Sequence, residues 1–243
     1  MMLRSVRRMT GTVAILLTLG GGAMGAQREV NGVKYEIIET SSEKVRVVWE
    51  GRDERPLRTF SAAANEAEAD GGKVRWIMNG GIFEPGGIPS GLLIQGGRER
   101  IPVNRRQGVG NFYLQPNGVF YFGRQKAGVV KTEEWPVAGD WVGAVQSGPL
   151  LLRNGVVHPL FRKESTSRLH RNGVGVKKDG TILLAISISR SPKYPNLYEF
   201  AMMFRSLGCD DALFLDGDIS RLEMGGAVPQ DGQSYGSFLV VME

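Results

Sequence analysis

The sequence is poor in the residues on which many catalytic and metal sites depend. It has a single cysteine, Cys209, and two histidines, His158 and His170, among 243 residues. One cysteine cannot form an internal disulfide bond, and neither histidine has a metal-ligand partner at a useful spacing. We therefore predict a partly buried structural thiol at Cys209 and surface or turn positions for both histidines.

Several common signatures are missing as well. The chain has no G-x-S-x-G nucleophile elbow, no C-x-x-C pair and no Walker phosphate loop. The usual serine hydrolases, zinc sites and nucleoside-triphosphate sites therefore lose support. The four aspartates between positions 210 and 218 offer oxygen ligands but lack the spacing of an EF-hand loop. We assign no metal site, and the sequence leaves the cofactor unknown.

No linker, low-complexity run or block of charge divides the chain. Hydrophobic residues make up 42% and charged residues 23%, which is ordinary for one soluble globular domain. Glycine is abundant, with 34 residues, and the many tight turns that it allows indicate a strand-rich fold. We predict an α+β fold: one strand-rich domain over residues 27–243, with large mixed twisted sheets and a few helices.

The longest apolar run, at the N-terminus, is too short to span a bilayer as a stable helix. Three arginines precede the run over residues 13–19, and small residues follow it, which is the pattern of an export signal. We predict a signal peptide over residues 1–26, cleaved after Gly25 or Ala26, with an uncleaved anchor as the alternative. Its removal lowers the formal charge from +5 to +2. We expect a periplasmic or secreted protein with no membrane insertion after cleavage and no nucleic-acid partner.

Hydrophobic periodicity and turn residues place the elements of the domain. Helical spacing predicts helices over residues 57–69 and 196–207. Serines 41 and 42 predict a hairpin between the first two strands, and Asp179-Gly180 predicts another between residues 173–178 and 181–188. The predicted strands cover residues 33–39, 44–49, 74–78, 91–95, 98–103, 109–115, 118–122, 141–146, 149–152, 155–158, 173–178, 181–188, 212–215 and 237–242.

Two parts of the chain resemble each other in the same order. Residues 90–97 resemble residues 147–155, and residues 110–118 resemble residues 173–180. Each part also contains a helix, then a strand, then a polar turn. The turn begins at Asn79 in one part and at Asp216 in the other. We infer a weak internal duplication whose two polar turns meet at a shared cleft. The alternative is that any glycine-rich, strand-rich chain shows such similarities.

Polar residues end several apolar strands, and their types suit an anionic or sugar ligand. Glycines let a ligand approach backbone N–H groups, arginine matches the oxygens of a phosphate, and a carboxylate can act at an anomeric carbon. Each residue also has a plain structural alternative: a turn, a solvated charge, or a carboxylate that favours a helix N-terminus. The candidates are Asn79, Gly80, Gly81, Ser147, Gly148, Arg168, Arg171, Glu199, Asp216, Gly217 and Asp218.

Taken in order, these motifs resemble the phosphodiester glycosidase family. The resemblance rests on residues 79–83, 147–151, 171–175 and 197–217, and it covers roughly residues 30–243. It is strongest to the exported bacterial relatives of the N-acetylglucosamine-1-phosphodiester uncovering enzyme. Carried over, the resemblance implies an active site lined by the residues Asn79, Ser147, Arg171, Glu199 and Asp216.

The last motif departs from the family pattern. Many members have Asp-Gly-Gly-Gly-Ser-Ser at the last motif, whereas this chain has Asp-Gly-Asp-Ile-Ser-Arg over residues 216–221. Asp218 and Ile219 replace two small residues, so we predict a narrower and more acidic pocket. That departure puts the identity of the substrate in doubt.

The resemblance predicts an exported hydrolase that cleaves the glycosyl–phosphate bond of a sugar-1-phosphodiester. Asp216, Glu199 and Arg171 would be catalytic, with Arg171 and the N–H groups around Gly80 and Gly148 on the phosphate. Its partner would be a sugar phosphodiester or phosphoglycan. Two alternatives stay open: a non-catalytic envelope module that binds glycans or phosphoglycans, and a hydrolase of ordinary glycosides or cell-wall polymers. The predicted substrate-binding residues are Asn79, Gly80, Gly81, Ser147, Gly148, Gly217 and Asp218.

Overall fold

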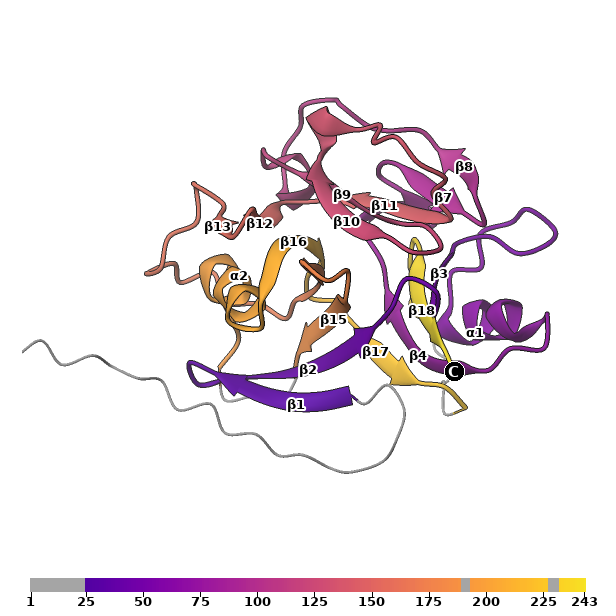
Figure 1. Cartoon of the computed structure of the whole chain (residues 1–243), viewed down its shortest axis with the longest axis horizontal. Helices are drawn as coiled ribbons and strands as arrows, with labels where there is room; N and C mark the ends of the chain where they lie inside the picture. The colour runs from indigo at the N-terminus through magenta and orange to yellow at the C-terminus, as the bar shows by residue number, and fades with distance from the viewer. Residues whose placement is uncertain (1–24, 189–192, 227–231) are drawn as a thin grey trace, which may run out of the picture.

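A computed structural model describes residues 25–188, 193–226 and 232–243 of the chain (Figure 1). Most of the predicted signal peptide lies outside the described residues. Gly25 and Ala26, the two predicted cleavage positions, begin the first strand, which pairs with the second strand over its whole length.

Seven strands form the largest sheet. Its centre is β16, with β14 on one side and β12 on the other, and the sheet carries the predicted strand that ends at Asp216. In spatial order the strands are β1 (Gly25–Val30), β2 (Val33–Thr40), β15 (Ile182–Ser187), β14 (Asn172–Lys177), β16 (Cys209–Asp216), β12 (Leu150–Arg153) and β13 (Val156–Val157).

Two further sheets of five and four strands pack with the first. The five-stranded sheet has the order β10 (Ala127–Lys131), β9 (Gly118–Phe122), β11 (Gly143–Ser147), β7 (Leu93–Gln95) and β8 (Arg98–Ile101). The four-stranded sheet has the order β17 (Leu222–Met224), β4 (Val74–Asn79), β18 (Phe238–Met242) and β3 (Val45–Val48). A short hairpin joins β5 (Phe83–Glu84) to β6 (Ile88–Pro89).

The three large sheets share one apolar core. Leu213 from the seven-stranded sheet, Phe120 from the five-stranded sheet and Met78 from the four-stranded sheet are all fully buried in it. Because side chains alternate along a strand, Ala212 and Phe214 point instead to the outer face. The strand that ends at Asp216 is therefore buried on both faces, as its apolar sequence predicted.

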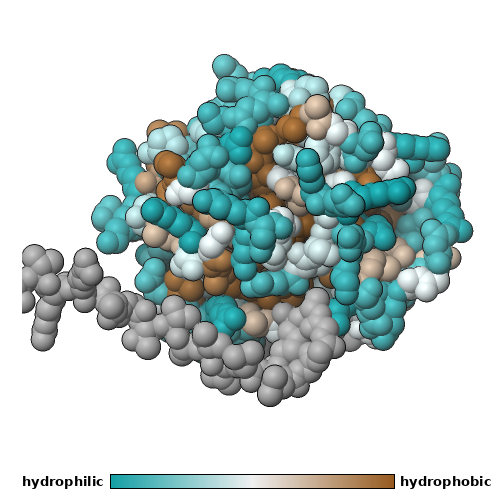
Figure 2. Space-filling model, in the orientation of Figure 1, coloured by the Kyte–Doolittle hydropathy of each residue, from teal (hydrophilic) through white to brown (hydrophobic). Residues whose placement is uncertain are grey.

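Two helices cover the outer faces of two sheets (Figure 1). The helix α2 (Leu197–Ser206) packs Phe200 and Phe204 on the seven-stranded sheet. It packs closely because Gly175 lies beneath it: a Cβ there would be 2.6 Å from the Phe204 ring and 2.7 Å from the Cys209 sulfur. The helix α1 (Phe60–Glu68) covers the four-stranded sheet. On the face in Figure 2, apolar surface lies mainly in hollows between polar side chains.

The predicted strand-rich domain with few helices is confirmed, and so are both helices and the hairpin β14–β15. Three details were wrong. All strand pairs among the described residues are antiparallel, not mixed. The turn after β2 leads the chain into another sheet, so β2 and β3 do not form a hairpin. Residues 111–113 form a 3-10 turn, η1 (Asn111–Tyr113), where a strand was predicted.

Five strands were missed, because β1, β10, β17 and both strands of the β5–β6 hairpin were not predicted as strands. The first overlaps the predicted signal peptide, and the others are short or lack clear alternation. A second 3-10 turn, η2 (Thr132–Glu134), follows β10. The internal duplication stays a prediction. One pair of similar segments differs in structure, since residues 111–113 form η1 whereas residues 172–177 form β14.

Candidate active site

Two strands from different sheets end at the same corner of the molecule. Asn79 is the last residue of β4, and Asp216 is the last residue of β16. The Asn79 side-chain Nδ2 donates a hydrogen bond of 2.9 Å to Asp216 Oδ2. The two polar turns that the sequence singled out therefore meet, although 137 residues separate them.

The Asn79 amide is held so that its N–H group faces the carboxylate. Its Oδ1 accepts hydrogen bonds from Asn172 Nδ2 at 2.9 Å and from the Arg221 backbone N–H at 2.8 Å. Asn79 and Asn172 are 1% and 0% exposed, so these bonds are made away from water. With the oxygen occupied, only the NH₂ group is left for Asp216. Asn172 lies within residues 171–175, on which the family resemblance rests, but no pattern in the sequence distinguishes it from its neighbours.

The Asp216 carboxyl group titrates well above the usual range of an aspartate. Burial, with a smaller contribution from nearby Asp218, raises its pKa to about 6, although the hydrogen bonds from the Gly217 N–H and Asn79 act in the opposite direction. The Gly217 N–H donates to Asp216 Oδ1 at 2.7 Å. A carboxyl group that changes charge near neutral pH is suited to acid–base or nucleophilic chemistry.

His170 fixes the turn that follows Asp216. Its Nε2 lies 2.9 Å from the Ser220 carbonyl oxygen, and its Nδ1 lies 2.9 Å from Ser187 Oγ. A carbonyl can only accept, so Nε2 carries the proton, and the Ser187 hydroxyl donates to Nδ1. Burial lowers the pKa of His170, which keeps the ring neutral. His170 is half-buried in a loop. His158 is only 4% exposed, so a surface position was wrong for it, but it begins a turn in which its carbonyl accepts from the Phe161 N–H.

Arg171 is buried, with 1% of its surface exposed. Its Nε donates to the Pro195 carbonyl at 3.1 Å, and one terminal nitrogen donates to the Ser167 carbonyl at 3.1 Å. The other terminal nitrogen, Nη1, has no hydrogen-bond partner among the described residues. Burial lowers the pKa of Arg171 to about 10, so the group stays charged at neutral pH, helped by Asp218. The surface alternative is excluded.

A cavity of about 530 Å³ opens beside Arg171. It lies between the segment of residues 160–167 and the beginning of α2. The Arg171 guanidinium carbon also lies 5.6 Å from the Phe214 ring centroid, two residues before Asp216. Asp218 interacts electrostatically with both Asp216 and Arg171. The carboxylate and the guanidinium therefore belong to neighbouring parts of one region.

Glu199 has several partners of its own. It forms ion pairs with Arg168 and with Lys193, the latter at 3.0 Å. It also completes a capping box at the start of α2, where its N–H donates to Asn196 Oδ1 at 2.9 Å. Burial would raise the pKa of Glu199, but the hydrogen bonds from Arg168, Lys193 and Asn196 lower it. The geometry favours a positioning role over an acid–base role.

The predicted Ser147 and the glycines hold loops together. Ser147 Oγ donates to the Leu215 carbonyl at 2.9 Å and accepts from the Ile82 N–H, which ties β11 to β16. The Gly80 N–H donates to the Ser237 carbonyl at 2.7 Å. That amide is therefore not the free anion donor that we expected. A Cβ at Gly81 would lie 2.9 Å from the Gln146 carbonyl oxygen, and a Cβ at Gly148 would lie 2.7 Å from the Asn117 Cβ, so both positions have room only for glycine.

The two residues that depart from the family pattern have different environments. Ile219 packs against the apolar cluster beneath α1, which includes Phe60 and Tyr235. Asp218 is exposed next to Asp216. Of the two, only Asp218 alters the charge of the site, which agrees with the predicted acidic character, whereas Ile219 serves the core.

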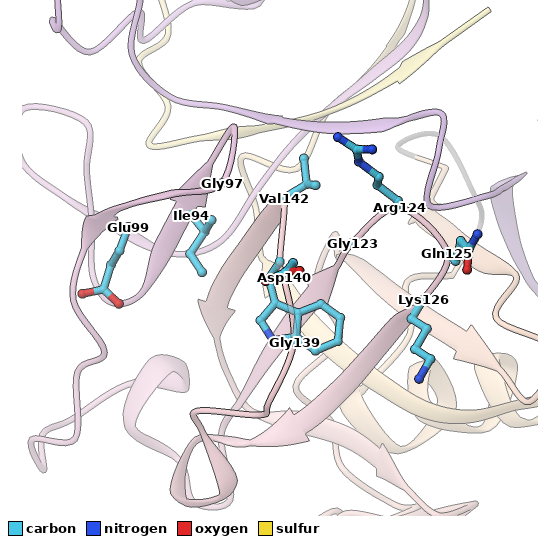
Figure 3. Close-up of a pocket in the computed structure, with 11 residues that line it drawn as sticks. Ile94, Gly97, Glu99, Gly123, Arg124, Gln125, Lys126, Gly139, Asp140 and Val142 are labelled. Atoms are coloured by element: carbon cyan, nitrogen blue, oxygen red, sulfur yellow. The ribbon is translucent and has the colours of Figure 1, made fainter.

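A second cavity, of about 800 Å³, lies on the five-stranded sheet (Figure 3). Trp141, Arg124, Lys126 and Glu99 line it, and none of the predicted site residues does. Its charged side chains extend in different directions in the close-up. Volume alone therefore does not mark the active site. Among the described residues, no three His, Cys, Asp or Glu side chains gather into a metal site.

The strand-rich fold thus holds a half-buried aspartate bound by an amide, and a buried arginine, both of which interact with Asp218. A family model described as phosphodiester glycosidase matches residues 72–236. The uncharacterized protein YigE of Escherichia coli K12 is 34% identical over 199 residues, which cover 81% of this chain and 76% of that protein. The chain belongs to the phosphodiester glycosidase family.

Two solved structures share the fold. One is the catalytic domain of zebrafish N-acetylglucosamine-1-phosphodiester α-N-acetylglucosaminidase, with a TM-score of 0.62, 16% identity, and coverage of 91% of this chain and 82% of that one. The other is a protein of Burkholderia pseudomallei described as exported, with a TM-score of 0.56, 13% identity, and coverage of 90% and 74%. In the described part of this chain, no helix is long and apolar enough to span a membrane.

Proposed function

We propose that the chain is an exported hydrolase that cleaves the glycosyl–phosphate bond of a sugar-1-phosphodiester. Membership of the family supports the reaction class. The observation that carries the proposal is the Asp216 carboxyl group, which is half-buried, held by Asn79 and has a pKa raised to about 6. Export is supported by the basic and apolar N-terminus and by the fold that the chain shares with a protein described as exported.

Arg171 binds the phosphate in this proposal. Its guanidinium is charged, makes no ion pair among the described residues, and has one terminal nitrogen without a hydrogen-bond partner. A buried cation of this kind is stabilised when an anion binds beside it. The carbonyls of Pro195 and Ser167 fix the plane of the guanidinium in advance, so little order is lost on binding.

Asp216 acts at the anomeric carbon in its ionised form. The bond between the anomeric carbon and the phosphate oxygen breaks, and its electron pair leaves with the phosphate monoester. The Asp216 carboxylate stabilises the positive charge that develops on the sugar, and water then supplies the new hydroxyl group and releases a proton. A phosphate monoester is a good leaving group, so one carboxylate suffices. Asn79 keeps the carboxylate oriented, and Glu199 positions Arg168 and the start of α2.

The test is hydrolysis of α-N-acetylglucosamine-1-phosphate methyl ester, with release of methyl phosphate as the measured product. We expect turnover by the wild type and a loss of at least about 10²-fold in Asp216→Asn. Asp210→Asn is the matched control, because Asp210 lies on the same strand and makes only a long ion pair with Lys178, at 3.8 Å. We expect it to keep full activity.

Circular dichroism establishes that both variants are folded. Unchanged turnover in a folded Asp216→Asn protein rejects the role of the carboxylate. Saturable binding of sugar phosphodiesters by the wild type, with no product from any of them, rejects hydrolysis in favour of the binding module.

A further inference from the structure

The cavity beside Arg171 has mainly apolar walls. Leu160 and Phe161 line it on one side, Leu197 and Tyr198 at the start of α2 on another, and Leu114 completes the wall. These apolar side chains form a surface that is suited to an alkyl chain.

The cavity is also lined by cationic groups. Arg171 is buried with an unpartnered Nη1, and its backbone neighbours hold it in position. The N-terminal end of α2, with its partial positive charge, also borders the cavity, and the hydroxyl residues Ser165, Thr166 and Ser167 lie along the same segment. The segment adds Arg162 and one acid, Glu164. The site therefore combines an anion position with apolar walls.

The rim of this cavity exposes a large apolar side chain. Leu160 is 61% exposed, although it lies in a segment with charged neighbours, Arg162 and Lys163. The segment runs between β13 and β14 alongside α2 (Figure 1). A bound alkyl chain would remove Leu160 and the apolar wall from water together, which is favourable in proportion to the area covered.

We propose that the cavity beside Arg171 binds the alcohol part of the substrate, and that this alcohol is an alkyl chain of the lipid type. The inference rests on the proposed function and names its substrate class: a sugar joined through a phosphodiester to an apolar alcohol. The sugar lies at Asp216, the phosphate at Arg171, and the alkyl chain between residues 160–161 and the start of α2.

The test compares two esters of α-N-acetylglucosamine-1-phosphate, one with methanol and one with hexanol. Each methylene group that becomes buried strengthens binding about fourfold. The hexyl ester has five methylene groups more than the methyl ester, and burial of about three to four of them would lower its KM in the wild type by roughly 10²-fold, with a similar kcat for both. Leu160→Asn should raise the KM of the hexyl ester about tenfold and leave the methyl ester unchanged.

Val156→Asn is the matched control. Val156 is 67% exposed on β13, which precedes the segment of residues 160–167, and it lies outside this cavity, so its replacement should leave both KM values unchanged. Equal KM values for the two esters in the wild type overturn the alkyl assignment while the proposed function stands. If neither ester is hydrolysed, calorimetry with the hexyl ester decides: binding that weakens in Leu160→Asn supports the cavity, and no binding overturns it.

Discussion

The partial burial of Asp216 conflicts with the charge that its side chain carries in the proposed reaction. Its burial raises the pKa of the carboxyl group to about 6, so the ionised form that the proposed reaction uses is less stable in the fold than it is in water. Asn79 and the Gly217 N–H offset part of this cost by donating to the two carboxylate oxygens. Ionisation of Asp216 therefore lowers the free energy of unfolding, and this cost grows as the pH rises.

The raised pKa of Asp216 predicts how stability depends on pH. An unfolded aspartate titrates near about 3.9. The contribution of this group is therefore fully present below about pH 4 and is lost as the pH rises through about 6. Relative to Asp216→Asn, the wild type should lose roughly 2–3 kcal/mol of unfolding free energy between pH 4 and pH 8. Urea unfolding at pH 4, 6 and 8 measures this difference.

Burial lowers the pKa of His170, but this residue is present in both proteins, so its effect on the unfolding free energy cancels in the comparison. A difference in unfolding free energy that stays constant from pH 4 to pH 8 would mean that the pKa of Asp216 is not raised. The same ionisation gives the activity an acid limb near pH 6, because Asp216 works as a carboxylate.

The start of α2 links stability to the substrate cavity. Asn196 caps the helix by accepting from the Glu199 N–H, and its Nδ2 donates to the carbonyls of Lys163 and Ser165 at 3.0 and 2.9 Å. These bonds hold the segment of residues 160–167 against the helix. One side chain therefore terminates an element and shapes the cavity beside it.

Asn196→Ala should lower the unfolding free energy by about 1–2 kcal/mol and raise the KM for sugar phosphodiesters several-fold, because the cap and two loop bonds are lost together. Thr59→Ala provides the control, since Thr59 caps α1 by accepting from the Ala62 N–H at 3.3 Å, away from the site. It should cost about 1 kcal/mol with no change in KM. A KM that is unchanged in Asn196→Ala would show that the segment needs no such anchor.

At the scale of the whole molecule, the site exists because two sheets meet at one corner. Asn172 on β14 donates to both the backbone and side-chain oxygens of Asn79 on β4, at 2.8 and 2.9 Å. Ser147 connects β11 to β16 in the same region. The packing of three sheets around one core therefore decides where the Asn79 amide points.

Asn172→Ala should destabilise the fold by about 1–3 kcal/mol and shift the acid limb of the pH–rate profile upward, since a loosened Asn79 donates less well to Asp216. Asn117→Ala is the control: Asn117 is 1% exposed and donates to the Phe112 carbonyl at 2.7 Å, outside the site. It should lose similar stability without a shift of the profile. An unshifted profile in Asn172→Ala would contradict the orienting role.

Local patterns in the sequence determined the elements and the candidate residues. The apolar run before Asp216, the Asp179-Gly180 turn and the spacing of α2 each depend on neighbours along the chain, so they were predictable. The placement of β2 and β3 in different sheets was not predictable, and the predicted hairpin between them was wrong, because the choice of sheet depends on partners far away in sequence.

The sequence by itself therefore determined a strand-rich member of the phosphodiester glycosidase family and the residue types of its site. The tertiary structure alone decided which of those residues act together: it paired Asn79 with Asp216, buried Arg171, tied Glu199 to Arg168, and brought in Asn172 and His170. The physical reason is that pKa values and hydrogen-bond partners depend on burial and on contacts between distant segments, which one-dimensional spacing does not contain.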